Sequence, residues 1–318
     1  MLMLTGVEVA CCVVVGLIVD MLIGEVSRWH PLVGFGNWAI RIESSLNHLH
    51  ASRWTGAFAW CVAVLPLVVI TQVLLLLATR FSVWLAPVLH ILLLYFCVGL
   101  RSLRDHNLPI QRALENGDLV SARRLTSYIV SRDTTQGDEE YLSKASVESV
   151  LENGCDAVFA TLFWFVLLGG AGAVLYRASN TLDAMWGYRS DRFLRFGCVA
   201  ARIDDGLNWI PARLTALSYA LLGQTRFALH CWRTQAPGWP SPNAGPVMSA
   251  GAGALGLALG GSARYDGVDE IRPLLGAGRP ASSKDISSAW RLVLNAAVLW
   301  SGVIILTAIF MGGALYAA

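Results

Sequence analysis

The sequence predicts an all-α polytopic integral membrane protein, and its composition, its apolar runs and its loop charges lead to this prediction. Of the 318 residues, 55% are hydrophobic and only 14% are charged, and the mean hydropathy is +0.54. Soluble domains carry about 25% charged residues, so this chain has too little charge to cover a surface that faces water. The net charge of +2 argues against the basic face that nucleic-acid-binding proteins present, and we expect no nucleic-acid partner.

Four apolar runs are long enough to cross a bilayer, which takes about 20 mostly apolar residues in a helix. They are residues 4–24, 56–79, 81–100 and 292–316. No basic stretch precedes the first run, which argues against a cleaved signal peptide. Pro66 and Pro87 lie in the second and third runs, and membrane helices tolerate such prolines.

A fifth apolar segment, residues 157–176, either crosses the bilayer or turns back as a re-entrant hairpin. Its centre reads LGGAG, a sequence that permits a turn. Cytoplasmic loops are enriched in Lys and Arg, and residues 101–155, 177–213 and 262–291 contain seven, six and five of them. A hairpin keeps these three basic segments on the cytoplasmic side, whereas a crossing places 177–213 outside. We therefore favour the hairpin.

We expect one membrane-embedded domain over residues 1–318. Within it, 101–155 forms a polar cytoplasmic helical loop and 177–267 forms a motif-bearing region. The loop shows helical patterns at 102–116 and 118–131, separated by the turn-forming sequence ENGD,. The seven cysteines have no CxxC spacing, so we interpret them as reduced packing residues rather than disulfide or zinc partners.

Five polar clusters interrupt the apolar chain on the predicted cytoplasmic side. They are DMLIGEVSRWHP (20–31), SRDTTQGDEE (131–140), NTLDAMWGY (180–188), ARIDDGLNWIPARL (201–214) and SPNAG (241–245). Glu148 and Glu152 follow the second cluster at i,i+4 spacing, so they share a helix face on which two carboxylates can hold one cation. Structural interpretations stay open for each cluster: an interfacial anchor, a turn with a helix cap, a solvated face or a plain turn.

The cluster at 201–214 is the most difficult to explain as structure alone. Asp204 and Asn208 align at i,i+4, and Pro211 removes a backbone hydrogen bond just before Arg213,. Ionisable residues beside a membrane interior are costly and usually functional, although a structural ion pair is the alternative. The sequence contains neither GxxxxGK[ST] nor a Ser/His/Asp order typical of hydrolases,.

Taken in order, these clusters resemble the adenosylcobinamide-phosphate synthase (CobD/CbiB) family of cobalamin biosynthesis, over about residues 15–267. The blocks that carry the resemblance are D-x-x-x-G with R-W-H-P (20–31), SRDT, ESVLEN (148–153), NTLDAMWGY, ARIDDGLNWIPARLTAL and SPNAG. The chain departs from the family pattern at residues 24–26, which read GEV where GDP is common. It also departs after SPNAG, where PVM replaces Trp-Pro-Glu and removes an acid.

The resemblance implies a multi-pass enzyme of the bacterial inner membrane with its active site on the cytoplasmic side. Such an enzyme uses ATP and Mg²⁺ to join adenosylcobyric acid to aminopropanol O-phosphate (or aminopropanol), and the corrinoid is its substrate. Association with other membrane-bound cobalamin enzymes is a further expectation. The alternatives are a non-catalytic AmpE-like signalling protein and a small-molecule transporter.

The family motifs mark the positions for site residues, and residue chemistry suggests their roles. Phosphoryl transfer uses carboxylate-held Mg²⁺ and arginines on the phosphates. We therefore expect Asp204, Asp205, Glu148 and Asp183 to be catalytic, and Asp204, Asp205, Glu148 and Glu152 to hold metal. We expect substrate or phosphate contacts from Arg28, His30, Arg132, Asp133, Thr134, Asn180, Arg202, Asn208, Arg213 and Asn243.

Overall fold

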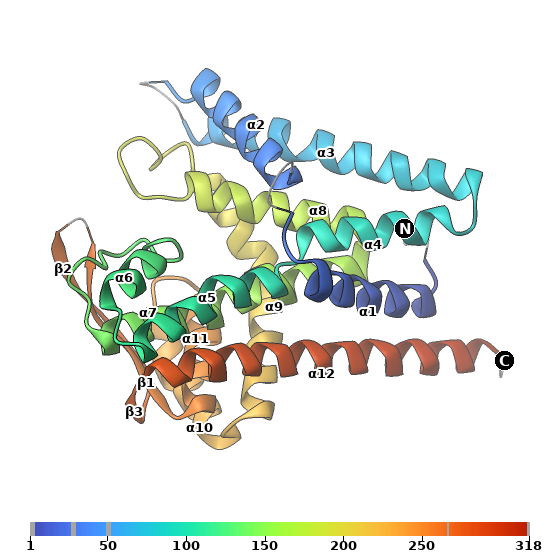
Figure 1. Cartoon of the computed structure of the whole chain (residues 1–318). Helices are drawn as coiled ribbons and strands as arrows, with labels where there is room; N and C mark the ends of the chain where they lie inside the picture. The colour runs from blue at the N-terminus through green and yellow to red at the C-terminus, as the bar shows by residue number, and fades with distance from the viewer. Residues whose placement is uncertain (1–3, 27–29, 49–51, 266, 317–318) are drawn as a thin grey trace. The chain divides into compact units, whose positions relative to one another are not determined.

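The computed structural model describes residues 4–26, 30–48, 52–265 and 267–316, and it is largely helical (Figure 1). Contacts within the chain define two compact units. Unit 1 comprises Met1–Gly99, Ala160–Asn208 and Ser301–Ala318, and unit 2 comprises Leu100–Phe159 and Trp209–Trp300. Each unit is assembled from segments that are distant in sequence, so no single chain boundary separates them. The single functional domain expected from the sequence stays a prediction.

Five helical stretches are long and apolar enough to cross a membrane. They are Gly6–Ile23, Arg53–Phe81, Leu85–Glu115, Glu139–Trp186 and Ser283–Phe310. The four predicted spans fall within the first, second, third and fifth stretches and the residues just beyond them, and the fourth stretch contains the whole of the ambiguous segment 157–176. The prediction of a polytopic, mostly helical membrane protein is therefore confirmed.

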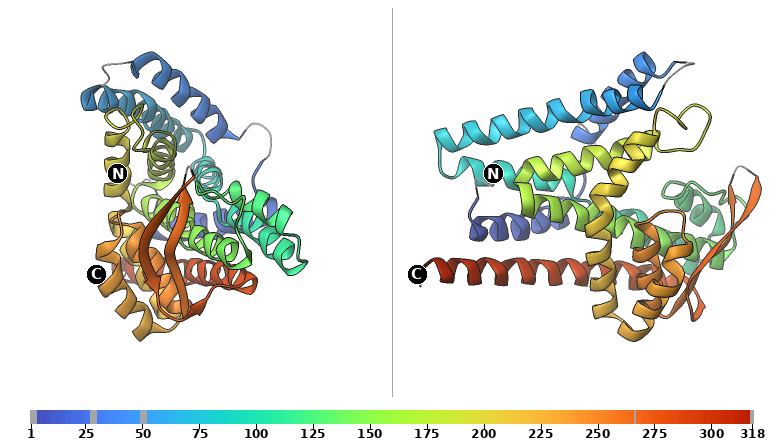
Figure 2. Two further views of the ribbon diagram at one scale, coloured as in Figure 1. Left: turned by 90° about the vertical axis from the view of Figure 1, so that its left-hand side faces the viewer. Right: turned by 180° about the vertical axis from the view of Figure 1, so that it is seen from behind.

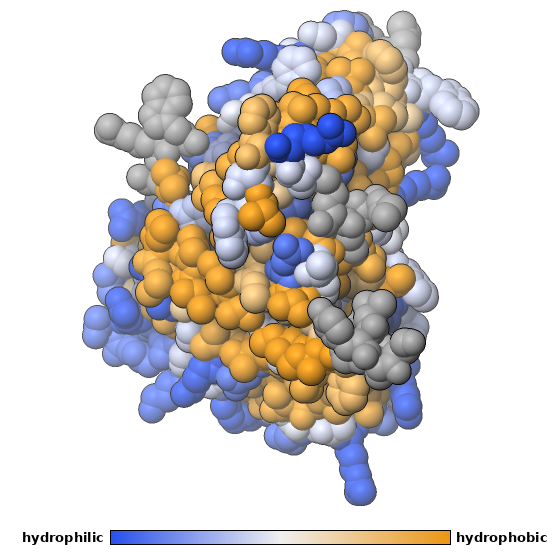
Figure 3. Space-filling model, turned by 90° about the vertical axis from the view of Figure 1, so that its right-hand side faces the viewer, coloured by the Kyte–Doolittle hydropathy of each residue, from blue (hydrophilic) through white to orange (hydrophobic). Residues whose placement is uncertain are grey.

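Unit 1 is built from α1 (Gly6–Ile23), α2 (Pro31–Leu46), α3 (Arg53–Phe81), α4 (Leu85–Cys97), α8 (Ala160–Trp186), the start of α9 (Cys198–Leu222) and the end of α12 (Ser283–Tyr316). Its core is an apolar cluster that includes Phe35, Trp60 and Trp186. Other side chains of α3 are exposed although they are apolar, among them Val69 at 58% and Leu74 at 55%. Figure 3 shows a largely hydrophobic face at the end of unit 1 that carries the α3–α4 turn. Exposed apolar faces of this kind fit contact with lipid.

Helix α8 reverses direction at Gly169, and Figure 2 shows its two arms running back beside each other. Gly169 has φ 65° and ψ −153°, a conformation that glycine adopts without a Cβ penalty. Trp164 on the first arm donates from Nε1 to the carbonyl of Leu207 at 3.0 Å, and Tyr176 on the second arm donates to Oδ1 of Asn208 at 2.9 Å. Residues on opposite sides of the break thus reach adjacent positions of α9. The structure contains the turn that the hairpin interpretation requires.

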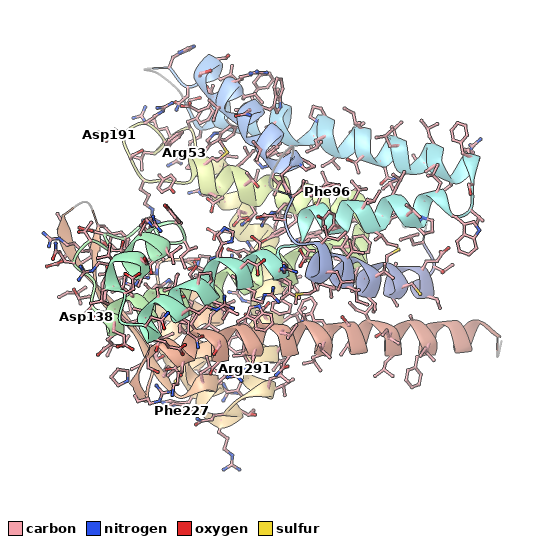
Figure 4. The ribbon with its side chains drawn as sticks, in the orientation of Figure 1. Arg53, Phe96, Asp138, Asp191, Phe227 and Arg291 are labelled. Atoms are coloured by element: carbon pink, nitrogen blue, oxygen red, sulfur yellow. The ribbon has the colours of Figure 1, made fainter. Side chains whose placement is uncertain are left out.

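Unit 2 is helical except for one small sheet. Its helices are α5 (Leu100–Glu115), α6 (Leu119–Ser127), α7 (Glu139–Gly154), a π-helical turn Cys155–Phe159, α10 (Thr225–Gln235), a 3₁₀ turn Ala236–Gly238 and α11 (Ala244–Leu255), together with the start of α12. Asp138 accepts from the backbone N–H of Tyr141 at 2.8 Å and caps α7, where Figure 4 labels it. The two helices predicted in the polar loop correspond to α5 and α6, and the second ends at Ser127 rather than at residue 131.

The sheet was not predicted, and within the described ranges it is the one departure from an all-α chain. Strands β1 (Leu257–Tyr265) and β2 (Val268–Gly276) pair antiparallel, and β3 (Arg279–Pro280) pairs parallel to β1. The register shifts between Gly260 and Gly261, which have φ values of 73° and 71°. A bulge with two positive φ angles requires glycine. This bulge carries the backbone N–H of Gly260 to a buried carboxylate described below.

Candidate functional site

The first candidate site lies in unit 1, where α9 packs against the second arm of α8. Asp204 on α9 is only 7% exposed. Its Oδ1 accepts from Nδ2 of Asn180 at 3.3 Å, and its Oδ2 accepts from Nδ2 of Asn208 at 3.0 Å. Asn208 in turn accepts from the hydroxyl of Tyr176 at 2.9 Å. The predicted i,i+4 alignment of Asp204 with Asn208 is confirmed, and Asn180 joins them.

The carboxylates of this site repel one another. Burial, together with the nearby Asp183 carboxylate, raises the pKa of Asp204 to about 7, although the hydrogen bonds from the two amides lower it. Burial also raises the pKa of Asp205, against the opposing charge of Arg189. A buried carboxylate beside another carboxylate is stabilised either by a proton or by a cation.

Magnesium fits the donor chemistry of this site. Mg²⁺ prefers oxygen ligands and is usually held by one or two carboxylates, with water and substrate phosphates completing its shell. Asp204 and Asp205 supply such carboxylates, and Asp183 interacts with both. Among the residues that the structure describes, no three His, Cys, Asp or Glu side chains form a closed metal cluster. An open site of one or two carboxylates is therefore the form that these residues can offer.

The second candidate site is a pocket of about 390 Å³ in unit 2. The loop before α7, the helix α7 itself, the loop before α11 and the β1–β2 hairpin all contribute to its walls. Among the side chains that line it are Ser131, Arg132, Glu148, Glu152, Trp239 and Arg272. The structure thus brings the SRDT and ESVLEN motifs to one pocket.

Glu148 is the centre of a buried charge cluster in this pocket. Its side chain is 2% exposed, and it binds Arg132 through Nη2 of the arginine. Arg272 donates to it from Nη1 at 3.0 Å and from Nη2 at 3.3 Å. The backbone N–H of Gly260 donates to Oε1 at 2.8 Å. Both carboxylate oxygens are therefore occupied, which favours a positioning role over the predicted metal-binding and catalytic roles. Glu152 shares the helix face with Glu148 as predicted and lines the same pocket.

Arg213 binds the protein itself in this structure. Its Nη1 donates to Oδ1 of Asn243 at 2.7 Å and to the carbonyl of Trp209 at 3.0 Å, and its Nη2 donates to the carbonyl of Pro242 at 3.0 Å. The guanidinium also lies 4.6 Å from the centre of the Trp209 ring. Arg213 and Asn243 therefore fasten the SPNAG loop to α9. The substrate contacts expected from both residues stay predictions.

Asp133 and Thr134 form a structural turn beside the pocket. Oδ1 of Asp133 accepts from the backbone N–H of Thr135 at 2.8 Å and from its hydroxyl at 2.6 Å. The backbone N–H of Asp133 donates to the carbonyl of Arg264 at 2.7 Å, and the Thr134 hydroxyl donates to the carbonyl of Arg123 at 2.9 Å. These bonds match the turn interpretation of the SRDT motif and place Arg132 in the pocket wall.

The remaining predicted residues lie apart from these contacts. His30 caps α2, because its Nδ1 accepts from the backbone N–H of Leu32 at 3.2 Å, and its ring lies edge-on to Phe96 (labelled in Figure 4). Arg202 is exposed on α9. Arg28 lies outside the residues that the structure describes. The substrate roles of these three residues stay predictions.

The sequence analysis missed Arg272 and Trp239. The guanidinium of Arg272 lies 5.5 Å from the centre of the Trp239 ring, and both residues line the pocket. Neither belongs to a motif that we identified, and Arg272 comes from a strand that was not predicted. The Trp-Pro pair at 239–240 directly before SPNAG was the available signal for one of them.

Comparison with known proteins agrees with the motif pattern. A family model described as "CobD/Cbib protein" matches residues 13–293. The cobalamin biosynthesis protein CobD of Stutzerimonas stutzeri is 55% identical over 308 residues, which cover 96% of this chain and 98% of the relative. The protein of the same name from Chromobacterium violaceum is 49% identical over 305 residues, covering 94% and 96%. That from Mycobacterium tuberculosis is 36% identical over 306 residues, covering 92% and 93%. No solved structure matches the chain.

Proposed function

The chain belongs to the CobD/CbiB family of cobalamin biosynthesis, and on that premise we propose that it is an ATP-dependent amide ligase. Its substrates are adenosylcobyric acid and aminopropanol O-phosphate (or aminopropanol), and the product with the phosphorylated amine is adenosylcobinamide phosphate. The observation that carries this proposal is the buried Asp204 site, whose bonded partners are neutral amides. A buried carboxylate that is held by neutral amides fits a reaction that needs Mg²⁺ beside phosphates.

The reaction proceeds in two steps. A carboxylate oxygen of adenosylcobyric acid attacks the terminal phosphorus of ATP, the bond to the ADP oxygen breaks, and an acyl phosphate forms. The amine then attacks the acyl carbon, phosphate leaves with its bonding electrons, and the amine loses a proton. Both steps develop negative charge on phosphate oxygens, so cationic groups accelerate both.

The residues of unit 1 are suited to holding the cation and moving the proton. Asp204 and Asp205 would hold Mg²⁺, which when bound neutralises phosphate charge. Asn180 and Asn208 fix the orientation of Asp204 through one hydrogen bond to each oxygen. Asp183, whose charge interacts with Asp204 and Asp205, would accept the proton that the amine loses.

The proposed location is the bacterial inner membrane, with the site on the cytoplasmic side. The apolar helices make the protein multi-pass, and the relatives named above are bacterial. Two observations support the cytoplasmic side. ATP is supplied in the cytoplasm, and Lys and Arg, which are enriched in cytoplasmic loops, number seven, six and five in residues 101–155, 177–213 and 262–291,. Association with other membrane-bound cobalamin enzymes stays a prediction.

A mass-spectrometric assay tests the proposal. Full-length protein in detergent receives Mg-ATP, adenosylcobyric acid and aminopropanol phosphate, and adenosylcobinamide phosphate and ADP are quantified. We expect Asp204→Asn and Asp205→Ala to lower the rate at least about 100-fold, a loss typical of removing a group that supports transition-state charge. Asp191→Asn, in an exposed loop of unit 1, is the matched control and should retain the rate. Product without ATP, or full activity in Asp204→Asn, would refute the proposal.

A further inference from the structure

One buried charge cluster in the wall of the pocket in unit 2 carries more positive than negative charge. Arg132 and Arg272 both bind the single carboxylate of Glu148, so these three groups sum to one positive charge. The positively charged amino group of Lys144 also interacts electrostatically with Glu148, Arg272 and Arg132. Arg132 is 8% exposed and Glu148 is 1% exposed. Because an unbalanced charge is costly where water is scarce, this cluster favours an anionic group of a ligand beside it.

One nitrogen of Arg132 is left for such a ligand. Its Nη2 binds Glu148, whereas its Nη1 is buried and has no hydrogen-bond partner among the residues that the structure describes. Buried donors are nearly always paired in native proteins, so an unpaired one calls for a partner. The fork of donors on a guanidinium matches the oxygens of phosphate. Arg272, stacked on Trp239 at 5.5 Å, presents a second guanidinium to the same pocket.

Carboxylates line this pocket as well. Glu152 on α7 and Glu270 on β2 are both lining residues, together with the hydroxyl-bearing Tyr265. A ligand with an anionic group alone would be repelled by these carboxylates, whereas a ligand that also bears an ammonium group is attracted by them. The volume of about 390 Å³ lies at the lower end of small-molecule pockets, which span roughly 300–1,000 Å³.

We propose that this pocket binds a small zwitterion that carries both a phosphate monoester and a primary amine. The phosphate binds Arg132 and Arg272, the ammonium group binds Glu152 and Glu270, and Glu148 is a positioning residue that holds the two guanidinium groups. The proposal rests on the proposed function, because it locates the amine substrate of the ligation. It also makes Arg272 a determinant of specificity for the phosphorylated amine. The phosphates of ATP offer the same chemistry, and the experiment separates the two sources.

Binding to the full-length protein in lipid nanodiscs tests this inference. Titration calorimetry measures the affinity for aminopropanol phosphate, aminopropanol, inorganic phosphate and Mg-ATP. We expect aminopropanol phosphate to bind at least about tenfold more tightly than inorganic phosphate or aminopropanol, because each of these lacks one of its two charged groups.

Three variants resolve the contributions of the charged groups. Arg272→Gln should weaken aminopropanol phosphate at least about tenfold and leave Mg-ATP unchanged, and Arg272→Lys should restore part of the affinity. Glu270→Gln, at an exposed position, should weaken aminopropanol phosphate and leave inorganic phosphate unchanged. Arg264→Gln is the control, since Arg264 is an exposed arginine of the same hairpin and bonds only Gly267 through its side chain among the described residues. Size-exclusion profiles verify that each variant is folded.

Two results would overturn the inference. Loss of Mg-ATP binding in Arg272→Gln would make this a nucleotide pocket, and unchanged affinities in both Arg272→Gln and Glu270→Gln would show that it binds neither group. Turnover separates this inference from the proposed function. If product forms and the variants leave the KM for the amine unchanged, the pocket assignment fails and the ligase stands. If aminopropanol phosphate binds as expected but no product forms, the ligase fails and the pocket stands.

Discussion

Replacing Asp204 with asparagine tests whether this buried carboxylate is maintained for a cation at the expense of stability. In the folded protein, burial and the Asp183 charge raise the pKa of Asp204 to about 7, compared with about 3.9 for an aspartate in an unfolded chain. Each pKa unit corresponds to about 1.4 kcal/mol, so ionised Asp204 costs the fold on the order of 4 kcal/mol well above pH 7.

The sign follows from the direction of this shift. The folded pKa lies above the unfolded one, so the contribution of Asp204 to stability is complete below about pH 4 and is lost as the pH rises through about 7. Asparagine keeps the shape of the side chain and cannot ionise. We therefore expect metal-free Asp204→Asn to be more stable than the wild type at both pH values, with a smaller difference near pH 5 than at pH 8.

Thermal unfolding in detergent with a chelator, followed by circular dichroism at pH 5 and pH 8, measures this difference. Mg²⁺ should then stabilise the wild type at pH 8 more than the variant, because the variant keeps only one of the two carboxylates that would hold the cation. Asp191→Asn controls for the loss of one negative charge. A variant that is less stable than the wild type at pH 8 without metal, or equal stabilisation of both by Mg²⁺, would refute this reasoning.

Three further substitutions test the fold around the two sites. Glu148→Gln leaves Arg132 and Arg272 without their shared counter-ion. We expect the unfolding free energy, measured by denaturant titration, to fall by about 3–5 kcal/mol. An unchanged unfolding free energy would show that the cluster is not buried. Gly169→Ala forces alanine to φ 65° and ψ −153°, a region that essentially only glycine adopts, and brings its Cβ to 2.5 Å from Cε1 of His90. The backbone strain alone should cost about 1–3 kcal/mol, seen as a lower thermal midpoint. An unchanged midpoint would contradict the reversal of α8. Tyr219→Phe removes the hydroxyl that donates to the carbonyl of Leu151 at 3.1 Å and should cost about 1 kcal/mol, whereas a larger loss would indicate a packing role.

The membrane helices could be predicted because the bilayer imposes a simple rule on sequence. A span needs an uninterrupted apolar run, and α1, α3 and α12 fall on such runs. Helical spacing was equally informative, since it places Asp204 with Asn208 and Glu148 with Glu152 whatever the tertiary fold is. The reversal of α8 was harder, because glycine permits a turn without requiring it. Loop charge, rather than local propensity, favoured the hairpin.

The β1–β2 hairpin could not be predicted from hydrophobic alternation. Its exposed residues include Val268, Ile271 and Leu274, so apolar side chains do not alternate with polar ones as they do in a strand with one wet face. The bulge at Gly260 further breaks the pattern. The Asp-Gly pair at 266–267 was a turn signal,, and the long apolar and glycine-rich stretch before it obscured the strands.

Charge balance in the folded chain, rather than residue type, decides which acidic motif residues are candidates for chemistry. Glu148 and Asp204 are equally acidic in the sequence and are both buried. Two arginines and a backbone N–H surround Glu148, so its negative charge is more than compensated, which fits the proposed anion. The bonded partners of Asp204 are neutral amides and its near neighbour is another carboxylate, so its charge is under-compensated, which fits the proposed cation. A ligation that consumes ATP needs both kinds of site, one for Mg²⁺ and one for phosphate. Asn180 lies 24 residues from Asp204 in the sequence, and Arg272 lies 124 residues from Glu148. Because such partners are distant in sequence, the motifs alone could not separate the two roles.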